Sequence, residues 1–497
     1  MDESLDGMVR WHARHRADAS AVICGDARRS YSELYDRSGR LAAGLLATGL
    51  KPGDRVAILL PNCIEYLELY LAAARSGLPL VPINAALTGP EIAYILEDSG
   101  AALVIAADGL DVPEGLPVIR DLAALIDGGS ALEAVVPGPD AVFFQGYTSG
   151  TTGRPKGCVQ TLGAFVEHFR RSFGLYRHDA DDVMLMPGPL FHEAPALFSL
   201  AQLYYGGTVL LLSRFDAATA LTEIGTHRAT TIGFAVPTML DRMIPAAREH
   251  DTSSLRSIVT AGAPLHPETR EGTLRAFPTA ALHEFYGGTE IGIITNIEHR
   301  AGRAFGSSVG TAVPGFDVVL LDETDQPVAP GEVGLIYVSP IMMAGYHGRP
   351  QATADATRTL DGVDWLTLGD LGRLDEDGHL YLVDRKSHMI ITGGENVYPA
   401  EVEAVLAEHP AIDDVAVIGL PDADWGEAVT AVIATTGEAP DLDSVRTFAR
   451  ARLAGYKTPR RVVIVDEIPR TASGKILKHR LRNDLAGGEP PSEPGGR

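Results

Sequence analysis

The fold of this chain can be inferred outward from Tyr147-Thr148-Ser149-Gly150-Thr151-Thr152-Gly153-Arg154-Pro155-Lys156-Gly157. The apolar residues 141–144 just before this stretch predict a buried strand. Apolar side chains recur at helical spacing just after it, at Leu162, Phe165, Val166, Phe169 and Phe173. We therefore expect a loop that joins a strand to a helix.

The composition of this loop favours phosphate binding. Its glycines let the backbone turn sharply and approach a ligand closely. Its N–H groups and hydroxyls, together with Lys156, can surround phosphate oxygens. A Ser/Thr/Gly-rich stretch that arose by chance would more often be a surface loop. Here the closing Pro155-Lys156-Gly157 favours a phosphate site. The loop is not of the Walker A type, because it lacks a Gly-Lys-Ser/Thr ending.

Two further motifs carry chemistry. The first is Glu284-Phe285-Tyr286-Gly287-Gly288-Thr289-Glu290, in which the glycines allow close ligand approach and Glu290 offers a hard oxygen for Mg²⁺. The second is Ile468-Pro469-Arg470-Thr471-Ala472-Ser473-Gly474-Lys475-Ile476, which places Lys475 on a Gly/Ser loop expected to be exposed and mobile. Taken alone, either charged residue would more often be a solvated side chain.

These motifs, in this order, resemble those of the adenylate-forming superfamily, which includes acyl-CoA synthetases, adenylation domains and beetle luciferase. The resemblance covers nearly the whole chain. It implies a large N-terminal α/β domain of parallel-sheet subdomains at 1–384 and a small, mobile α+β domain at 389–486. A hinge at 385–388 would join them, and the Gly/Pro-rich tail 487–497 is expected to be disordered.

The pattern of the first hundred residues favours the same fold class. Ser30-Tyr31-Ser32-Glu33 predicts a capping box at the start of a helix. Strands near 56–60, 79–84 and 103–105 alternate with helices near 66–74 and from 91, which indicates βαβ units and a parallel sheet. No Gly-x-Gly-x-x-Gly opens a helix there, so we expect the nucleotide site elsewhere.

The resemblance also assigns site residues. Lys475, Thr289, Glu290 and His192 would be catalytic, and Glu290 would be the metal ligand. ATP or AMP would contact Thr148, Ser149, Gly150, Thr151, Thr152, Gly153, Lys156, Ala263, Pro264, Tyr286, Gly287, Asp370 and Arg385. The acyl pocket would comprise His192, Glu193, Phe234, Val236, Ala261, Gly262, Gly288 and Ile291. Gly393, Gly394 and Glu395 would line the coenzyme A channel, and Ser387 would belong to the hinge.

The chain departs from the family pattern at several positions. Leu368 stands where threonine is usual before Gly369-Asp370, and Ser387 and His388 replace acidic or basic hinge residues. Amino-acid-activating relatives carry aspartate at the position of His192, so an α-amino acid is not the expected substrate. Glu193 either favours a substrate with an N–H group or a cation, or is a helix-start residue stabilised by the helix dipole.

The net charge, the cysteines and the hydrophobic pattern of the chain argue against several classes of function. A formal net charge of −23 on 497 residues argues against nucleic acid or an anionic membrane as the main partner. Three cysteines without metal-ligand spacing fit structural thiols in a reducing compartment. No signal peptide or spanning segment is visible, so we expect a cytoplasmic protein, either a monomer or a homodimer.

The predicted activity is that of an ATP-dependent acid–thiol ligase. It would use Mg²⁺, convert an apolar fatty or aromatic acid to acyl-AMP with release of pyrophosphate, and transfer the acyl group to coenzyme A. Three alternatives remain open: an amide synthetase or carrier-loading enzyme, a luciferase-type oxygenase, and a catalytically silent nucleotide-binding protein. The presence of Lys156, Glu290, Asp370, Arg385 and Lys475 argues against the silent protein.

Overall fold

The computed structural model describes residues 2–130, 132, 137–148, 155–300, 306–385, 388–392, 395–422, 425–470 and 476–486, without the side chains of Phe173, Arg385, Asn396 and Ala486. The chain divides into two compact units. The first comprises residues 1–318 and 338–366, and the second comprises 319–337 and 367–497. The expected α/β class is confirmed, as both units combine helices with sheets. The predicted boundary at 384 remains a prediction.

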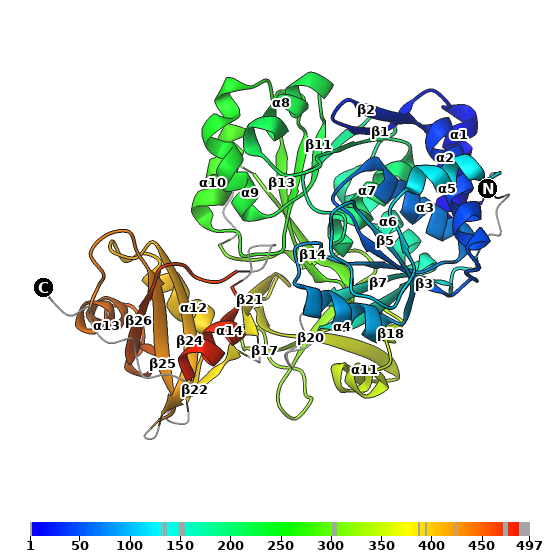
Figure 1. The fold of residues 1–497 in the computed structure, drawn as a ribbon. Coiled ribbons are helices and arrows are strands. Elements are labelled where there is room, and N and C mark those ends of the chain that lie inside the picture. Colours follow the sequence, from blue (N-terminus) through cyan, green and yellow to red (C-terminus); the bar gives the residue numbers. More distant parts are fainter. Residues whose placement is uncertain are drawn as a thin grey trace, which may run out of the picture. The chain divides into compact units, whose positions relative to one another are not determined.

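The predicted alternation of strands and helices is confirmed in the first unit (Figure 1). Among the described residues, one sheet has the strand order β18-β8-β7-β4-β3-β5-β6. Its pairs from β7 to β6 are parallel, and β8 and β18 add an antiparallel edge. The strands are β3 Arg55–Leu59, β4 Leu80–Pro82, β5 Ala101–Ala106, β6 Val118–Ile119, β7 Val142–Thr148, β8 Lys156–Thr161 and β18 Gly345–Tyr346.

Helices from the start of the chain accompany this sheet. They are α1 Leu5–His15, α2 Tyr31–Ala47, α3 Ile64–Ser76, α4 Gly89–Ser99 and α5 Leu122–Gly128. The predicted capping box is confirmed at α2, where Ser30 Oγ accepts the Glu33 N–H at 3.3 Å and Glu33 Oε2 accepts the Ser30 N–H at 2.7 Å. On α4, Ile92, Ile95 and Leu96 pack into the apolar core beside β3 and β5, which leaves its other faces for polar contacts.

A second sheet of the first unit has the described strand order β15-β14-β13-β12-β11-β9-β10-β1-β2. All pairs from β13 to β1 are parallel, and antiparallel strands close both edges. Figure 1 shows α8, α9 and α10 grouped beside β11 and β13. The strands are β1 Ser20–Cys24, β2 Ala27–Ser30, β9 Val183–Met186, β10 Thr208–Leu211, β11 Thr231–Ala235, β12 Ser257–Thr260, β13 Ala281–Gly288, β14 Gly292–His299 and β15 Thr311–Ala312. The helices are α6 Leu162–Tyr176, α7 Glu193–Tyr205, α8 Ala217–His227, α9 Pro237–Met243, η1 Ile244–Glu249, α10 Pro267–Ala276 and, beyond the sheet, α11 Pro350–Ala356.

The structure corrects the prediction that the phosphate loop joins a strand to a helix. Strand β7 continues to Thr148, and the chain returns at Lys156 as β8, with Thr148 opposite Lys156 in an antiparallel pair. The helix α6 begins only at Leu162. The reason is that residues 157–160 are buried and pair with β7 before the Thr161 hydroxyl accepts the Ala164 N–H at the helix start. The loop therefore connects two strands of a hairpin.

The second unit contains a small α+β domain, as expected. Its described strands have the order β23-β22-β25-β24, with β26 parallel to β25. Alternate residues of β24 enter different apolar clusters, Val415 and Val417 in one and Ala416 and Ile418 in the other, so the sheet is covered on both faces. The elements are β22 Ile390–Thr392, β23 Glu395–Val397, α12 Pro399–Leu406, β24 Asp414–Asp422, β25 Gly426–Ala434, α13 Leu442–Arg450, η3 Gly455–Lys457, β26 Arg461–Val465 and α14 Lys478–Ala486.

The chain passes between the units within three strands of a further sheet. These are β16 Asp317–Leu321, β17 Gly334–Ser339 and β20 Val363–Leu374. Within the first unit, β19 Thr357–Leu360 pairs with the start of β20, and within the second, β21 Leu380–Arg385 pairs with its end. No helix in the described part of the chain is long and apolar enough to cross a membrane.

Candidate active site

Glu290 lies at the centre of the predicted site. It is 8% exposed and sits in the turn between β13 and β14. Its Oε1 accepts hydrogen bonds from the Thr148 hydroxyl and the Tyr346 hydroxyl, each at 3.1 Å. Its backbone carbonyl accepts the Met343 N–H at 3.1 Å. Two segments far apart in the sequence, at Thr148 and at 343–346, therefore hold Glu290.

A cation lies beside the same carboxylate site. The Nζ of Lys156 is 4.9 Å from the centroid of the Tyr346 ring, within the range of a cation–π contact. Thr148 and Lys156 are cross-strand partners in β7 and β8, so the two ends of the phosphate loop converge on Tyr346 and Glu290. Tyr346 is not among the predicted site residues, yet it contacts both Glu290 and Lys156.

Buried side chains of β8 support the turn that carries Glu290. The Gln160 side-chain amide donates to the Thr289 carbonyl, and the Cys158 thiol lies 3.4 Å from the same oxygen. Burial, followed by the Glu290 and Glu193 carboxyl groups, raises the pKa of Cys158 well above its usual range. This thiol is therefore protonated and structural, in agreement with the expectation for the cysteines.

Glycine is required at the end of this turn. Gly292 has φ +79°, and a Cβ added there would lie 2.1 Å from Cε1 of the buried His168. A side chain at this position would therefore meet both a left-handed backbone and an occupied space. His168 is a further residue near the site that no sequence motif indicated.

Glu193 is the first residue of α7, with His192 at the N-cap. This placement agrees with the helix-start alternative, yet Glu193 is only 7% exposed and its Oε1 has no hydrogen-bond partner in the described structure. Burial, and secondly the Glu290 carboxylate, raise the pKa of Glu193 to about 8. A helix dipole would lower it, so burial outweighs the dipole. His192 itself is exposed, with its ring 4.4 Å from that of Phe191.

Several predicted acyl-pocket residues meet at the carboxyl ends of β11 and β12. Gly262 has φ +88°, and a Cβ added there would lie 3.5 Å from Val236 Cγ1 and 3.7 Å from Phe234 Cζ. Both of these side chains, like Ala261, are largely buried. Gly188 and Pro195 also border Phe234 and were not indicated by the sequence. Ligands of parallel α/β sheets commonly bind at such strand ends.

The remaining predicted residues of the first unit lie near these elements. Gly288 ends β13 and Ile291 follows Glu290, but Ile291 has no exposed surface. Tyr286 and Gly287 lie on β13, which is the neighbour of β12. Ala263 is half-buried and Pro264 exposed just after Gly262.

In the second unit, Asp370 on β20 is 9% exposed and is the cross-strand partner of Arg385 on β21. Their pairing brings together two residues that the resemblance assigned to the ribose and phosphates. Glu395 is exposed on β23. The following predicted site residues lie outside the described residues: Ser149, Gly150, Thr151, Thr152, Gly153, Ser387, Gly393, Gly394 and Lys475.

The donor set around Glu290 fits Mg²⁺. Mg²⁺ binds hard oxygens and usually takes one or two carboxylates, with substrate phosphates and water completing its octahedron. No group of three or more His, Cys, Asp or Glu side chains suited to a metal occurs in the described part of the chain. Glu290 would therefore hold the ion together with nucleotide oxygens.

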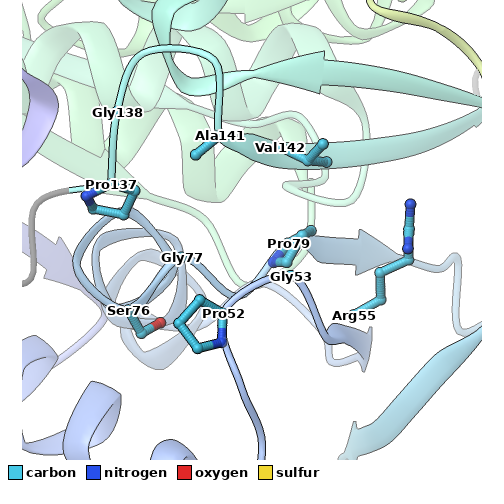
Figure 2. Close-up of a pocket in the computed structure, with 10 residues that line it drawn as sticks. All are labelled: Pro52, Gly53, Arg55, Ser76, Gly77, Pro79, Pro137, Gly138, Ala141 and Val142. Atoms are coloured by element: carbon cyan, nitrogen blue, oxygen red, sulfur yellow. The ribbon is translucent and has the colours of Figure 1, made fainter.

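A cavity of about 330 Å³ lies away from these residues (Figure 2). It is lined by Pro52, Gly53, Arg55, Ser76, Gly77, Pro79, Pro137, Gly138, Ala141 and Val142. None of them belongs to the predicted site, so this cavity is distinct from the predicted acyl pocket.

Known proteins resemble the chain over nearly its whole length. The model of the AMP-binding enzyme family matches residues 9–347, and that of the AMP-binding enzyme C-terminal domain matches 401–475. A feruloyl-CoA synthase of an Amycolatopsis species is 40% identical over 96% of this chain and 98% of its own. A fatty acid–[acyl-carrier-protein] ligase of Streptomyces coeruleorubidus is 35% identical over 98% of this chain and 97% of its own.

Solved structures agree with this similarity. The o-succinylbenzoate CoA synthetase of Bacillus subtilis, in complex with an acyl-adenylate intermediate, has a TM-score of 0.88 at 31% identity over 97% of this chain and 99% of its own. The same enzyme with ATP and a magnesium ion has a TM-score of 0.85 at 31% identity, over 95% and 98% of the two chains. The chain therefore belongs to the AMP-binding enzyme family, the adenylate-forming superfamily that its three motifs predicted.

Proposed function

We propose that this enzyme activates an apolar carboxylic acid with ATP as an acyl-adenylate and transfers the acyl group to the thiol of coenzyme A. The observation that carries the proposal is that the Thr148 and Tyr346 hydroxyls bind the Glu290 carboxylate, while Lys156 lies over the Tyr346 ring beside them. This arrangement combines a cation, hydroxyl donors and a hard anionic oxygen at the ends of the phosphate loop. Relatives named as CoA ligases support the thiol acceptor.

In the first half-reaction, a carboxylate oxygen of the acid attacks the α-phosphorus of ATP, and pyrophosphate leaves. The carboxylate is already ionised near neutral pH, so no general base is needed. The main cost is the approach of two anions, and the enzyme lowers it by positioning and charge stabilisation. Lys156 and the hydroxyls of Thr148, Thr151 and Thr152 would hold phosphate oxygens, and Lys475 would stabilise the charge that develops at phosphorus.

Glu290 would hold Mg²⁺, which neutralises phosphate charge when it is bound. The hydroxyls of Thr148 and Tyr346 orient this carboxylate before the nucleotide arrives. Asp370 would accept hydrogen bonds from the ribose hydroxyls, and Arg385 would contact ribose or phosphate. These residues supply orientation and charge, and none of them has to transfer a proton.

In the second half-reaction, the coenzyme A sulfur attacks the acyl carbon, AMP leaves, and the thiol proton is released. We propose that the small domain turns about residues 385–388 between the two steps, withdrawing Lys475 and presenting Gly393, Gly394 and Glu395 to the pantetheine arm. A hinge needs only residues that accept a change in φ and ψ, so Ser387 and His388 are compatible with this role.

The acid is proposed to be apolar, aromatic or of medium chain length. Phe234, Val236 and Ala261 supply an apolar wall, and Gly262 leaves room for a flat ring or an acyl chain. The similarity to a feruloyl-CoA synthase supports an aromatic acid. Burial raises the pKa of Glu193 to about 8, which favours its neutral form at pH 7. It therefore gives no support to a cationic substrate.

A second candidate acceptor is the thiol of a carrier protein. The 35% identical relative named as an acyl-carrier-protein ligase favours this alternative over free amines. The first half-reaction would be unchanged, and only the acceptor would differ.

One assay separates these functions: pyrophosphate and AMP release across a panel of carboxylic acids, each with and without coenzyme A. The proposed function predicts acid-dependent AMP and a CoA thioester. Thioester formed only with an acyl-carrier protein would support the second candidate, and an amide formed only with added amine would contradict both. If no acid yields AMP, the proposed function is wrong.

A further inference from the structure

We propose that Tyr94, Asp98 and Arg349 form a clamp that holds both ends of the phosphate loop, so that they act as positioning residues for ATP. This inference rests on the proposed function for the role of the loop, but the clamp itself rests on contacts between described residues. Tyr94 and Asp98 are four residues apart on α4 and so share one face of that helix. Arg349 comes from the turn between β18 and α11.

The first end of the loop is held at Tyr147. Consecutive side chains of a strand point to opposite faces, and in β7 Thr148 contacts Glu290 while Tyr147 points to α4. The Tyr147 hydroxyl donates to Asp98 Oδ2 at 2.9 Å. Burial and then this hydrogen bond raise the pKa of Tyr147, so the phenol remains a donor. One face of β7 therefore serves the reaction centre and the other face is anchored to the clamp.

The second end of the loop is held at Pro155. The Tyr94 hydroxyl donates to the Pro155 carbonyl at 2.9 Å. It also accepts a hydrogen bond from Arg349 Nη2 at 2.7 Å. Its other acceptor, Asp98 Oδ1, lies farther away at 3.3 Å, so the shorter contact to Pro155 is favoured. Because proline has no N–H group, its carbonyl is the hydrogen-bonding group that this residue's backbone can offer.

Arg349 ties the two anchors together. Its Nη2 donates to Asp98 Oδ1 at 2.7 Å as well as to Tyr94. The hydrogen bond to Asp98 raises the pKa of Arg349, which keeps the guanidinium charged. This nitrogen therefore binds both Asp98, which holds Tyr147, and Tyr94, which holds Pro155.

The clamp is continuous with the reaction centre through residues 345–349. Tyr346 in β18 contacts Glu290, and the next residue, His347, donates its backbone N–H to the Gly157 carbonyl at 2.7 Å. Two residues later the chain reaches Arg349. A shift of the Arg349 turn would therefore move both the clamp and a hydroxyl that orients Glu290.

A second set of contacts supports Tyr147 from the side of β3. Arg55 Nε donates to Gln145 Oε1 at 2.6 Å, and the Gln145 amide donates to the Tyr147 hydroxyl at 3.2 Å. Figure 2 shows Arg55 at the edge of the cavity described above, with its side chain extending away from Pro52 and Ser76. Arg55 Nη2 also lies 3.1 Å from His347 Nδ1.

A purely stabilising role does not account for this arrangement. The Arg349 side chain is 33% exposed, so solvent screens part of its ion pair with Asp98, whose side chain is 16% exposed. Their contacts converge instead on the residues that begin and end the loop. We therefore expect their loss to affect nucleotide binding far more than thermal stability.

The test uses Tyr94→Phe, which removes the hydrogen bond to Pro155, and Arg349→Met, which removes the bridge. Two measurements are made on the full chain: the Kd of Mg·ATP by calorimetry, and hydrogen exchange of peptides covering residues 145–160. Each variant should weaken Mg·ATP binding by about threefold to tenfold, the effect of one hydrogen bond. Exchange should increase in 145–160, and any further increase should be confined to α4 and residues 345–349, which carry the clamp. KM for ATP should rise while thioester formation from prepared acyl-adenylate keeps its kcat.

Matched controls are Tyr204→Phe, which loses a hydroxyl contact to the Glu3 carbonyl, and Arg461→Met, which loses an ion pair with Asp422 of similar exposure. The clamp is refuted if both test variants match these controls in ATP affinity and in exchange at 145–160. It is also refuted if exchange increases along the whole chain, because the role would then be structural. If the wild type binds no ATP, the proposed function fails, and the exchange at 145–160 still decides whether the clamp exists.

Discussion

Glu193 and Glu290 are both largely buried, and burial, followed by the Glu290 carboxylate, raises the pKa of Glu193 to about 8. Glu290 has two hydroxyl donors, while Glu193 Oε1 has no partner among the described residues. Glu193 therefore favours its neutral form near the carboxylate that is proposed to hold Mg²⁺.

Replacing Glu193 by Gln should change the pH dependence of stability. Between the ordinary pKa of 4.5 and about 8, the folded wild type retains a proton that the unfolded chain has lost. Wild-type stability therefore falls as pH rises through this window, by about 1.4 kcal/mol per pH unit at most. The amide introduced by Glu193→Gln stays neutral, so the melting temperature of the variant minus that of the wild type should increase from pH 5 to pH 8.5 in calorimetry.

Glu91→Gln is the matched control for this effect. Hydrogen bonds from Thr88 lower the pKa of Glu91, so both folded and unfolded states are ionised above pH 5. The melting temperature of Glu91→Gln minus that of the wild type should therefore stay constant from pH 5 to pH 8.5. A constant difference for Glu193→Gln as well would show that Glu193 is ionised in the folded enzyme.

Lys475→Ala should separate the two half-reactions. The lysine is proposed to stabilise charge only while the acid attacks ATP, so adenylation should fall by about 10²–10³. Thioester formation from chemically prepared acyl-adenylate should remain within about twofold of the wild type. Lys51→Ala, at an exposed lysine of a turn, is the control. Adenylation by Lys475→Ala within about threefold of the wild type would remove Lys475 from the mechanism.

Gly292→Ala should destabilise the turn that carries Glu290. The new Cβ would combine a φ of +79° with a clash against His168, at a cost of about 2–5 kcal/mol in unfolding free energy. Gly109→Ala has the same backbone demand, φ +78°, but no heavy atom within 4 Å of the added Cβ. It should cost about 1–2 kcal/mol. Chemical denaturation measures both.

A second variant tests the cause. In a His168→Ala background, which lacks the clashing ring, Gly292→Ala should cost less unfolding free energy than it does in the wild type. If Gly292→Ala and Gly109→Ala lose the same unfolding free energy, His168 does not restrict which side chains residue 292 can carry.

Much of the fold followed from local signals in the sequence. The capping box at Ser30 and the alternating strands and helices of the first hundred residues depend on short-range periodicity and turn chemistry. Strand β8 was missed because the helical spacing after residue 161 was extended back to the loop. Residues 157–160 instead pair with β7, a contact that only the folded sheet reveals.

Site residues could be predicted where a sequence motif itself indicates their chemistry. They could not be predicted where only tertiary contacts bring a residue into the site. Thr148, Lys156 and Glu290 stand in glycine-rich motifs, and the structure brings them together. Tyr346, Tyr94, Asp98 and Arg349 were not assigned roles, because their partners lie far away in the sequence. The neutral state of Glu193 could not be inferred either, since burial is a property of the packed protein.

The central claim is that the acid and ATP react beside the Glu290 carboxylate. It is tested most directly by measuring acid-dependent ATP–pyrophosphate exchange in the Glu290→Gln variant. Glu298→Gln, on the neighbouring β14, is the matched control. The account predicts that exchange by Glu290→Gln falls by about 10²–10³ while that of Glu298→Gln stays within about twofold of the wild type. Exchange by Glu290→Gln within about threefold of the wild type would contradict it.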